Sequence, residues 1–393
     1  MLFDSDPKDI PICMTNLHIY PSYLTNESRI IKESNSLVRN KLVDRIIIAG
    51  FWKEGLAKVE FINDKIVVVR LNCYFGKFSQ PKFLNSFPFL IFYFKCLVLG
   101  VREKVRLINC HTLTLLPLCT LMRFVLKAKL IYDPHELETE THESKGIRKK
   151  IARIIESNFI KRTDYCIVVS DSIKEWYVKK YGIKKIEVIK NIPSSNQMKV
   201  KAVNLKANLN LNSEDILFIY QGFLSVSRGV DTILKVFSHL ENDKHIVFMG
   251  FGPLEEVIKN ETKRKKNIHF LQAAKPTEVL NYTAGADIGI HIIPNTCLNH
   301  YYCLPNKVFE YVTAGVPFIV SNFPDIKKEF VAADVAWFVD ETVENFKQIV
   351  ELIDRDSLVK KKENCLMSRN QWSWENQDGI YAKIFKELYH PLD

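Results

Sequence analysis

Short apolar runs alternate along the whole chain with longer segments whose apolar residues recur every three or four positions, as in amphipathic helices. Runs such as RIIIAG (45–50) and PFIVS (317–321) are continuously apolar, which is typical of strands covered on both faces. Strands that alternate with helices form parallel sheets with helices on either side. The segments expected to be strands are 45–50, 65–71, 105–110, 128–133, 165–170, 186–191, 216–222, 245–250, 267–271, 287–293, 317–321 and 335–339. The pattern therefore predicts an α/β fold with two doubly wound, Rossmann-like domains.

The length of the chain supports two domains. It has 393 residues, more than the roughly 250–300 that one hydrophobic core normally serves. The polar stretch 193–215 interrupts the alternation near the middle and is the expected junction. We therefore expect an N-terminal domain over 1–192, a second domain over 193–371, and over 372–393 a C-terminal helix that packs back towards the first domain. Because ligands of open α/β sheets bind at the carboxyl ends of the strands, a cleft between two facing sheets is the expected site.

Positive charge is concentrated in the first half of the chain. The formal net charge is +10, yet residues 1–200 hold 33 Lys and Arg against 20 Asp and Glu, and the remainder is slightly acidic. This excess indicates an anionic partner for the first domain, such as a membrane surface or a phosphate-bearing acceptor; a merely solvated basic face is the alternative. No nucleic-acid-binding motif accompanies the charge, so nucleic acid is not expected as a partner.

The most apolar segment, FLNSFPFLIFYFKCLVLG (83–100), bears on where the protein works. Asn85 and Lys95 leave its apolar run too short to span a bilayer. A buried core helix is expected there, with a helix lying in a membrane surface as the alternative. The first residues contain no apolar run typical of a signal peptide. We expect a cytoplasmic location, with peripheral attachment to the inner face of the cell membrane as a further option.

The nine cysteines are scattered. They form no CxxC pair and no repeated spacing, which favours reduced thiols over disulfides or a zinc site.

The stretch LPNKVFEYVTAGVPFIVS (304–321) carries the most specific chemistry. Pro305 suits the first turn of a short helix, and Gly315 suits its end. Lys307 and Glu310 lie three residues apart and share a face of that helix. The helix N-terminus and Lys307 would attract a diphosphate, and Glu310 could accept hydrogen bonds from a ribose diol. A surface ion pair is the structural alternative.

Two other turns follow expected strands of the second domain. In YQGFLSVSRGVDTILKVF, Gly222 allows a close backbone approach, and Arg228 stands at the entry to the next helix, where it could hold a phosphate. In FMGFGPLEEV, Gly252 lies in a tight strand-to-helix turn. Taken alone, Arg228 is better explained as part of a solvated loop, and the turn at Gly252 could be any tight strand-to-helix turn.

These stretches occur in order together with PTEVLNYTAGADIGI, and the combination resembles the donor domain of family 4 glycosyltransferases of the GT-B fold, in the subgroup with a PNKxFEY motif. The resemblance covers about 215–325 well. Four segments of the first half, 26–34, 107–118, 130–136 and 166–177, resemble the acceptor domain more loosely.

The resemblance implies a retaining enzyme that moves a sugar from a nucleotide-diphosphate sugar to an acceptor hydroxyl. The acceptor expected is a saccharide or lipid-linked saccharide in surface polysaccharide assembly, with an anionic membrane contacted by the basic N-terminal domain. No metal and no cofactor are expected. The implied donor-binding residues are Gly222, Arg228, Gly252, Pro305, Asn306, Lys307 and Glu310, and the implied catalytic residues are His135 and Glu136.

Two departures from the family keep alternatives open. Tyr302 stands where many relatives have a first glutamate, and Phe223 stands where many have an arginine. A nucleotide-sugar epimerase and a non-catalytic nucleotide-sugar binding protein on the same scaffold are the alternative functions. A core histidine bonded to backbone is the alternative for His135. The donor sugar, its base, the acceptor, the linkage and the oligomeric state are not encoded in any motif.

Overall fold

The computed structural model describes residues 14–73, 87–240, 243–340 and 342–389. They form two compact units. The N-terminal unit comprises the described residues of 1–139, 144–189 and 377–393, and the C-terminal unit comprises those of 140–143 and 190–376.

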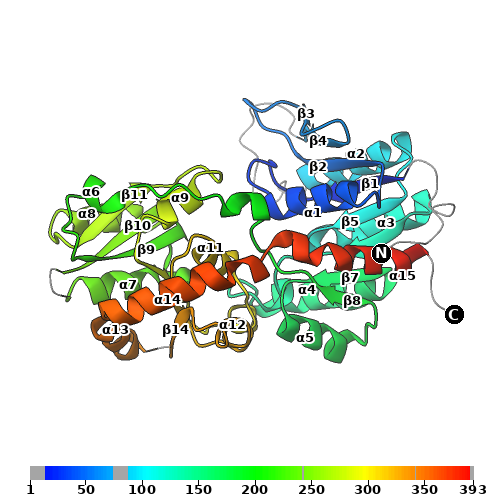
Figure 1. The fold of residues 1–393 in the computed structure, drawn as a ribbon. Helices are drawn as coiled ribbons and strands as arrows, with labels where there is room; N and C mark the ends of the chain where they lie inside the picture. Colours follow the sequence, from blue (N-terminus) through cyan, green and yellow to red (C-terminus); the bar gives the residue numbers. More distant parts are fainter. Residues whose placement is uncertain (1–13, 74–86, 241–242, 341, 390–393) are drawn as a thin grey trace. The chain divides into compact units, whose positions relative to one another are not determined.

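The N-terminal unit is built on an eight-stranded sheet of order β3-β4-β2-β1-β5-β6-β7-β8 (Figure 1). The strands are β1 (Thr15–Ile19), β2 (Arg45–Phe51), β3 (Val59–Phe61), β4 (Ile66–Leu71), β5 (Leu107–Cys110), β6 (Lys129–Tyr132), β7 (Tyr165–Val168) and β8 (Ile186–Val188). All pairings are parallel except that of β3 with β4. The sequence analysis missed β1 and β3. The first is fully buried but carries Asn16 and His18, so it does not form an apolar run, and the second is a three-residue exposed edge strand.

Helices cover both faces of this sheet (Figure 1). They are α1 (Ser28–Arg39), α2 (Phe87–Arg102), α3 (Leu116–Leu126), α4 (Gly146–Phe159), α5 (Asp171–Tyr181) and α15 (Asp378–Tyr389). The expectation of a buried core helix at 83–100 holds for only one side of the described part of that segment. Although α2 buries Phe92 and Cys96, it exposes apolar side chains, including Phe94, on its other side. Residues 83–86 lie outside the described residues.

The last helix belongs to the N-terminal unit. Arg39 of α1 donates to Asp378 at 2.7 Å, and Tyr165 of β7 donates to Glu387 at 3.1 Å. The helix begins later than the apolar pattern from residue 372 indicated, because residues 374–377 form a separate short 3-10 helix before it.

The C-terminal unit contains a six-stranded, all-parallel sheet of order β11-β10-β9-β12-β13-β14. Its strands are β9 (Ile216–Phe223), β10 (Lys244–Phe251), β11 (Ile268–Gln272), β12 (Ile288–His291), β13 (Phe318–Ser321) and β14 (Ala336–Val339). Its helices are α6 (Leu205–Asn208), α7 (Val230–Phe237), α8 (Glu255–Thr262), α9 (Val279–Thr283), α10 (Leu298–Tyr301), α11 (Asn306–Thr313), α12 (Pro324–Phe330), α13 (Val343–Leu352) and α14 (Arg355–Ser368). On one face the strands pack against α7 and α13 in a continuous apolar core.

Gly289 allows the Tyr311 ring of helix α11 to pack directly on the sheet. A Cβ atom at this position of β12 would come within 2.5 Å of the Tyr311 ring. The ring therefore rests on bare backbone, and its hydroxyl donates to the carbonyl of Ile290 at 3.0 Å. This contact fixes α11 next to the carboxyl ends of β9 and β12, where ligands of such sheets bind.

Among the described residues, no helix is long and apolar enough to cross a membrane.

Candidate active site

The ammonium group of Lys307 lies directly over Gly222. Lys307 is in the first turn of α11, which Pro305 enters in an extended conformation, and its Nζ atom is 4.9 Å from the centroid of the Tyr220 ring. Gly222, the last residue but one of β9, has a φ of +122°, and a Cβ atom built on it would lie 2.6 Å from Nζ. A side chain at position 222 would therefore displace the lysine.

The side chain of Lys307 has a lower pKa than an ordinary lysine. Burial lowers its pKa to about 8, and the nearby positive charge of Arg228 acts in the same direction. Glu310 opposes the shift without cancelling it. The buried ammonium group of Lys307 is thus kept near a second positive charge, which is costly unless an anion joins them.

Glu310 is anchored by neutral amides. Asn306 donates from Nδ2 to Oε1 at 3.0 Å, and Gln221 donates from Nε2 to Oε2 at 2.5 Å. Gln221 is oriented in turn by Thr283, whose hydroxyl donates to its amide oxygen at 2.5 Å. Since an ionised carboxylate has about four acceptor positions, Glu310 can still accept hydrogen bonds from a ligand's hydroxyl groups. Gln221 and Thr283 were not predicted, because only the fold brings them to α11.

The turn into α7 carries Arg228. It ends a single 3-10 turn (Val226–Arg228), and Gly229 follows with a φ of +70°. A Cβ atom at Gly229 would lie 2.3 Å from the carbonyl oxygen of Ile292, so the turn packs tightly on the end of β12. The arginine side chain is exposed, and its positive charge helps to lower the pKa of Lys307.

The remaining predicted position, Gly252, is a backbone feature. It adopts a φ of +151°, and a Cβ atom there would lie 2.5 Å from the carbonyl oxygen of Leu224. At the two family departures the structure shows aromatic side chains. Phe223 is exposed and packs edge-on against Phe251 with ring centroids 5.6 Å apart, and Tyr302 packs on Tyr301.

His291, the last residue of β12, was missed by sequence reasoning. Its side chain is only 1% exposed, and among the described residues neither ring nitrogen has a hydrogen-bond partner. Burial holds its pKa well below the usual value, and the charges of Lys307 and Arg228 add to the shift. A signal was present, since a histidine in the apolar run DIGIHII at the carboxyl end of a strand is unusual.

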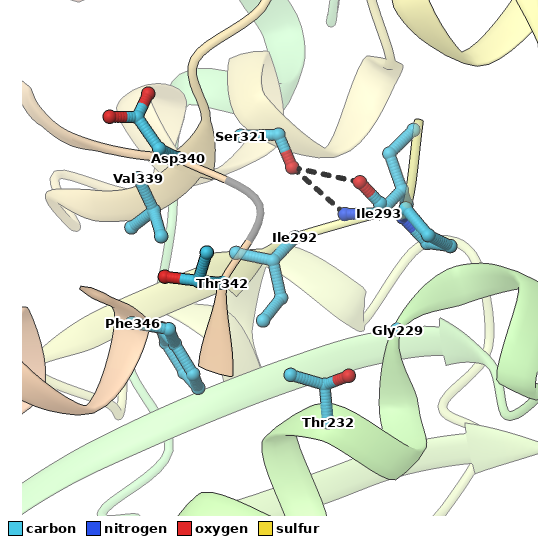
Figure 2. Close-up of a pocket in the computed structure, with 10 residues that line it drawn as sticks. Gly229, Thr232, Ile292, Ile293, Ser321, Val339, Asp340, Thr342 and Phe346 are labelled. Atoms are coloured by element: carbon cyan, nitrogen blue, oxygen red, sulfur yellow. Dashed lines mark hydrogen bonds between the residues drawn. The ribbon is translucent and has the colours of Figure 1, made fainter. Parts of the chain in front are cut away.

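A small recess of about 60 Å³ lies in another part of the C-terminal unit (Figure 2). Ile292, Val339 and Phe346 in its wall belong to the core beneath α7 and α13. Ser321 points into it, yet its hydroxyl is already engaged, accepting from the amide of Ile293 at 2.9 Å and lying 3.2 Å from the carbonyl of the same residue. Its lining includes neither Lys307 nor Glu310.

In the N-terminal unit, His135 stands just after β6. It is 25% exposed, and its Nε2 atom lies 3.1 Å from Nδ1 of His111. Burial lowers its pKa to about 3, although the Asp133 carboxylate acts to raise it. His135 is therefore neutral near pH 7. Glu136 follows on the surface, with an exposed side chain.

Asp133 is the charged centre behind His135. Arg29 of α1 donates to both carboxylate oxygens, at 2.7 and 3.2 Å, and also to the carbonyl of Ile189 at 2.9 Å. Burial acts to raise the pKa of Asp133, but the guanidinium and the neighbouring histidines outweigh it and hold the pKa far below its usual range. Asp133 is therefore a carboxylate at any ordinary pH.

Buried polar groups continue from His111 into the core. Nδ1 of His18 lies 2.8 Å from Nε2 of His111, and Nε2 of His18 lies 3.0 Å from Nδ2 of Asn16. Close by, Asn109 donates to Glu33 at 2.8 Å. Burial raises the pKa of Glu33 well above its usual value, and the nearby Asp133 carboxylate acts in the same direction.

Two sets of these side chains lie close enough together to hold a metal ion. One is His18, Glu33 and His111, and the other is His111, Asp133 and His135. In the second set the Arg29 guanidinium already occupies both oxygens of Asp133, and its positive charge disfavours a cation there. That no metal is needed stays a prediction.

Two family models match the chain. Glycosyltransferase Family 4 matches residues 42–192, and Glycosyl transferases group 1 matches residues 203–370. A chitobiosyldiphosphodolichol beta-mannosyltransferase of Kluyveromyces lactis is 23% identical over 314 residues, which is 70% of this chain and 69% of the relative.

Solved structures share the fold over nearly the whole chain. Sucrose-phosphate synthase from Thermosynechococcus elongatus has a TM-score of 0.76 at 13% identity, covering 96% of this chain and 99% of its own. WaaG, a glycosyltransferase of lipopolysaccharide biosynthesis, has a TM-score of 0.66 at 12% identity over 95% and 99%. Anabaena Alr3699/HepE in complex with UDP-glucose gives 0.66 at 13% identity over 94% and 99%. The expected fold of two Rossmann-like α/β domains is thereby confirmed.

Proposed function

Because the chain belongs to the family 4 type of GT-B glycosyltransferases, and so transfers a sugar from a nucleotide sugar, we propose that it is a retaining enzyme acting on a lipid-linked saccharide in surface polysaccharide assembly. The observation that carries the donor half of this proposal is the arrangement of Lys307 over Gly222 beside the anchored carboxylate of Glu310. Lys307 supplies a cation that can bind an anionic group, and Glu310 supplies a carboxylate that can accept hydrogen bonds from hydroxyl groups.

In this proposal the diphosphate of the donor binds at the N-terminus of α11. Lys307 and Arg228 neutralise it, and the free backbone N–H groups of the first helical turn add hydrogen bonds. Gly222 and Gly252 let the backbone come close to the ligand, and Pro305 and Asn306 set the start of the helix. Glu310 accepts from the ribose hydroxyls. Stabilising the leaving diphosphate in this way lowers the barrier to breaking the glycosidic bond.

His135 and Glu136 are proposed to contact the reacting sugar from the N-terminal unit. Held neutral, His135 can form a hydrogen bond with a sugar hydroxyl without carrying charge. No metal is invoked, because Lys307 and Arg228 can neutralise the diphosphate. Retention is proposed from the family resemblance. The Kluyveromyces relative is named for a β-linked product, so the anomeric configuration must be read from this enzyme's own product.

The helices α2, α3 and α4 support a membrane-bound acceptor. Helix α3 packs against both α2 and α4, and all three expose apolar side chains. These are Phe89, Leu90, Phe94, Val98, Val101, Leu121, Phe124, Val125, Ile147, Ile151 and Ile154. Helix α4 adds four cations within GIRKKIAR (146–153). Apolar side chains beside cations are typical of surfaces that lie on anionic bilayers, so we propose peripheral attachment to the inner face of the cell membrane.

The proposed function is tested by a transfer assay with short lipid-linked saccharides on anionic vesicles. The expected result is transfer from one nucleotide-sugar series, with a product whose NMR coupling shows the anomeric configuration of the donor. Transfer with inversion of the anomeric configuration would contradict only the proposal of retention and would leave the proposed sugar transfer standing. Binding of the nucleotide sugar without any turnover would support the non-catalytic alternative, and an epimer formed without acceptor would support the epimerase.

A further inference from the structure

Three histidines of the N-terminal unit form a hydrogen-bonded line from the core to the surface, which we call the histidine chain. It runs from His18 in β1 through His111 after β5 to His135 after β6. The two links are 2.8 Å, from Nδ1 of His18 to Nε2 of His111, and 3.1 Å, from Nδ1 of His111 to Nε2 of His135. Since β1, β5 and β6 are neighbours in the sheet, the chain crosses three adjacent strand ends.

The direction of these hydrogen bonds is decided by Asp133. Its Oδ2 atom lies 3.3 Å from Nδ1 of His111, and the carboxylate carries no proton because Arg29 binds both of its oxygens. A lone pair on Nδ1 of His111 would face this anion and repel it. The proton of His111 is therefore on Nδ1, and its Nε2 atom is an acceptor.

The other two rings follow from this choice. Nδ1 of His18 must donate to Nε2 of His111, which leaves Nε2 of His18 to accept from the amide of Asn16. At the other end, Nε2 of His135 faces the Nδ1–H group of His111 and accepts from it. A neutral His135 then carries its own proton on Nδ1. Each ring is thus held in the Nδ1–H tautomer, which free neutral histidine does not favour.

We propose that His18 and His111 are positioning residues that hold His135 as an Nδ1–H donor, so that His135 donates a hydrogen bond to a saccharide oxygen and does not act as a general base. The tautomer follows from the contacts of the N-terminal unit alone. The saccharide as ligand rests on the function proposed above, so the two parts fail separately.

The same atoms offer an alternative occupant, a divalent cation. Nδ1 of His111 lies 3.1 Å from Nε2 of His135 and 3.3 Å from Oδ2 of Asp133. The last two atoms are 3.9 Å apart, and a metal could bridge these separations. Binding would require Nδ1 of His111 to lose its proton beside the guanidinium of Arg29. The ion pair of Arg29 with Asp133 therefore favours the hydrogen-bonded chain.

The test is two-bond ¹H–¹⁵N NMR of the full chain with ¹⁵N-labelled histidine, which distinguishes Nδ1–H from Nε2–H rings. His135 is assigned by its loss in His135→Gln. We expect His18, His111 and His135 all to be Nδ1–H rings. An Nε2–H ring at His135 would overturn the proposal, as would one equivalent of Zn²⁺ that shifts the resonances of His111 and His135 and raises Tm.

A matched pair of variants tests the link to His135. His111→Asn places an amide near the position of Nδ1 and can still donate to Asp133 and His135, whereas His111→Gln places it near Nε2 and cannot. We expect His135 to keep its tautomer in His111→Asn and to lose it in His111→Gln. In transfer assays, kcat of His111→Gln should fall about tenfold further than that of His111→Asn, roughly one hydrogen bond, with little change in the donor KM. Equal behaviour of both folded variants, checked by Tm, would overturn the positioning role.

Discussion

The Nζ atom of Lys307 occupies the space that a side chain at position 222 would need, since a Cβ atom there would approach it to 2.6 Å. The absence of a side chain at Gly222 therefore makes room for the ammonium group of Lys307, which comes from the first turn of α11. The ammonium group is thereby kept close to the exposed backbone of Gly222, and an anionic ligand could contact the lysine and the backbone together.

Gly222→Ala tests this relationship. The methyl group should push the ammonium aside and weaken the binding of a nucleoside diphosphate by roughly tenfold, the equivalent of about 1.4 kcal/mol. The measurement is isothermal titration with the best-bound nucleotide. Gly55→Ala is a matched control, because Gly55 also has a positive φ, of +88°, but nothing within 4 Å of the added atom. It should reproduce the loss of Tm from backbone strain without the loss of affinity, and equal affinities in both variants would contradict the account.

Glu310→Gln should weaken nucleotide binding by roughly tenfold or more, because a charge-assisted acceptor contributes about 1.5–3 kcal/mol. Thr283→Val is expected to have a smaller effect in the same direction, since it frees Gln221, which orients the carboxylate. Glu256→Gln, an exposed change on α8, is the control. Deoxyribose nucleotides should lose less affinity in Glu310→Gln than ribose nucleotides do, and an equal loss for both would reject the ribose role.

The pKa of Lys307 predicts opposite pH effects on binding and on stability. Its folded-state pKa, about 8, lies below the ordinary 10.5, so the unfolded chain binds more protons between these values. The lysine therefore lowers the stability of the ligand-free protein below pH 8, and this penalty is relieved as the pH rises towards 10.5.

Affinity for a diphosphate should fall over the same pH range, because the neutral lysine no longer attracts it. Calorimetric titrations from pH 7 to 9.5 check the affinity, and Tm against pH checks the stability. In Lys307→Met, both the affinity for the diphosphate and Tm should depend less on pH over this range. A pH-independent affinity in the unaltered protein would exclude Lys307 as the diphosphate-binding cation.

Glu156 supports the N-terminal unit through buried hydroxyl groups. Tyr177 and Tyr181 donate to it at 2.6 and 2.7 Å, and Tyr132 donates at 3.2 Å. Glu156→Ala leaves these buried hydroxyls without their acceptor and should cost on the order of 3 kcal/mol in the free energy of unfolding. Because burial raises the pKa of this carboxyl group, Glu156→Gln should cost distinctly less. Urea unfolding measures both, and equal costs would contradict the prediction, because they would show that an amide of the same volume cannot replace the carboxyl group as an acceptor.

Leu90→Ser with Phe94→Ser tests the membrane surface. These side chains of α2 are 61% and 67% exposed, so the change should leave Tm nearly unaltered while weakening sedimentation with vesicles that contain anionic lipid. The control is Leu352→Ser with Met367→Ser, apolar residues of the C-terminal unit that are 79% and 74% exposed. Equal vesicle binding by all three proteins would contradict attachment through α2.

Sequence reasoning located the strands of the C-terminal unit within two residues, because each is a continuous apolar run between turn residues. It missed β1, whose buried Asn16 and His18 serve a polar network rather than the core. Lys307 and Glu310 could be singled out because both lie on one short helix. Gln221 and the histidine chain could not, because their partners lie on separate elements and meet only when the sheet forms. His291 was missed although its place in an apolar run was a signal.

The most direct test of the central claim, a nucleotide diphosphate held at the N-terminus of α11, is thermal stabilisation by UDP-, GDP-, ADP- and dTDP-sugars. Binding to the folded state at a hundredfold excess over Kd stabilises by about 2.7 kcal/mol. The account predicts a clear rise in Tm with one nucleotide series in the unaltered protein, reduced in Lys307→Met and in Glu310→Gln. A rise that both variants retain in full would place the donor elsewhere and contradict the account.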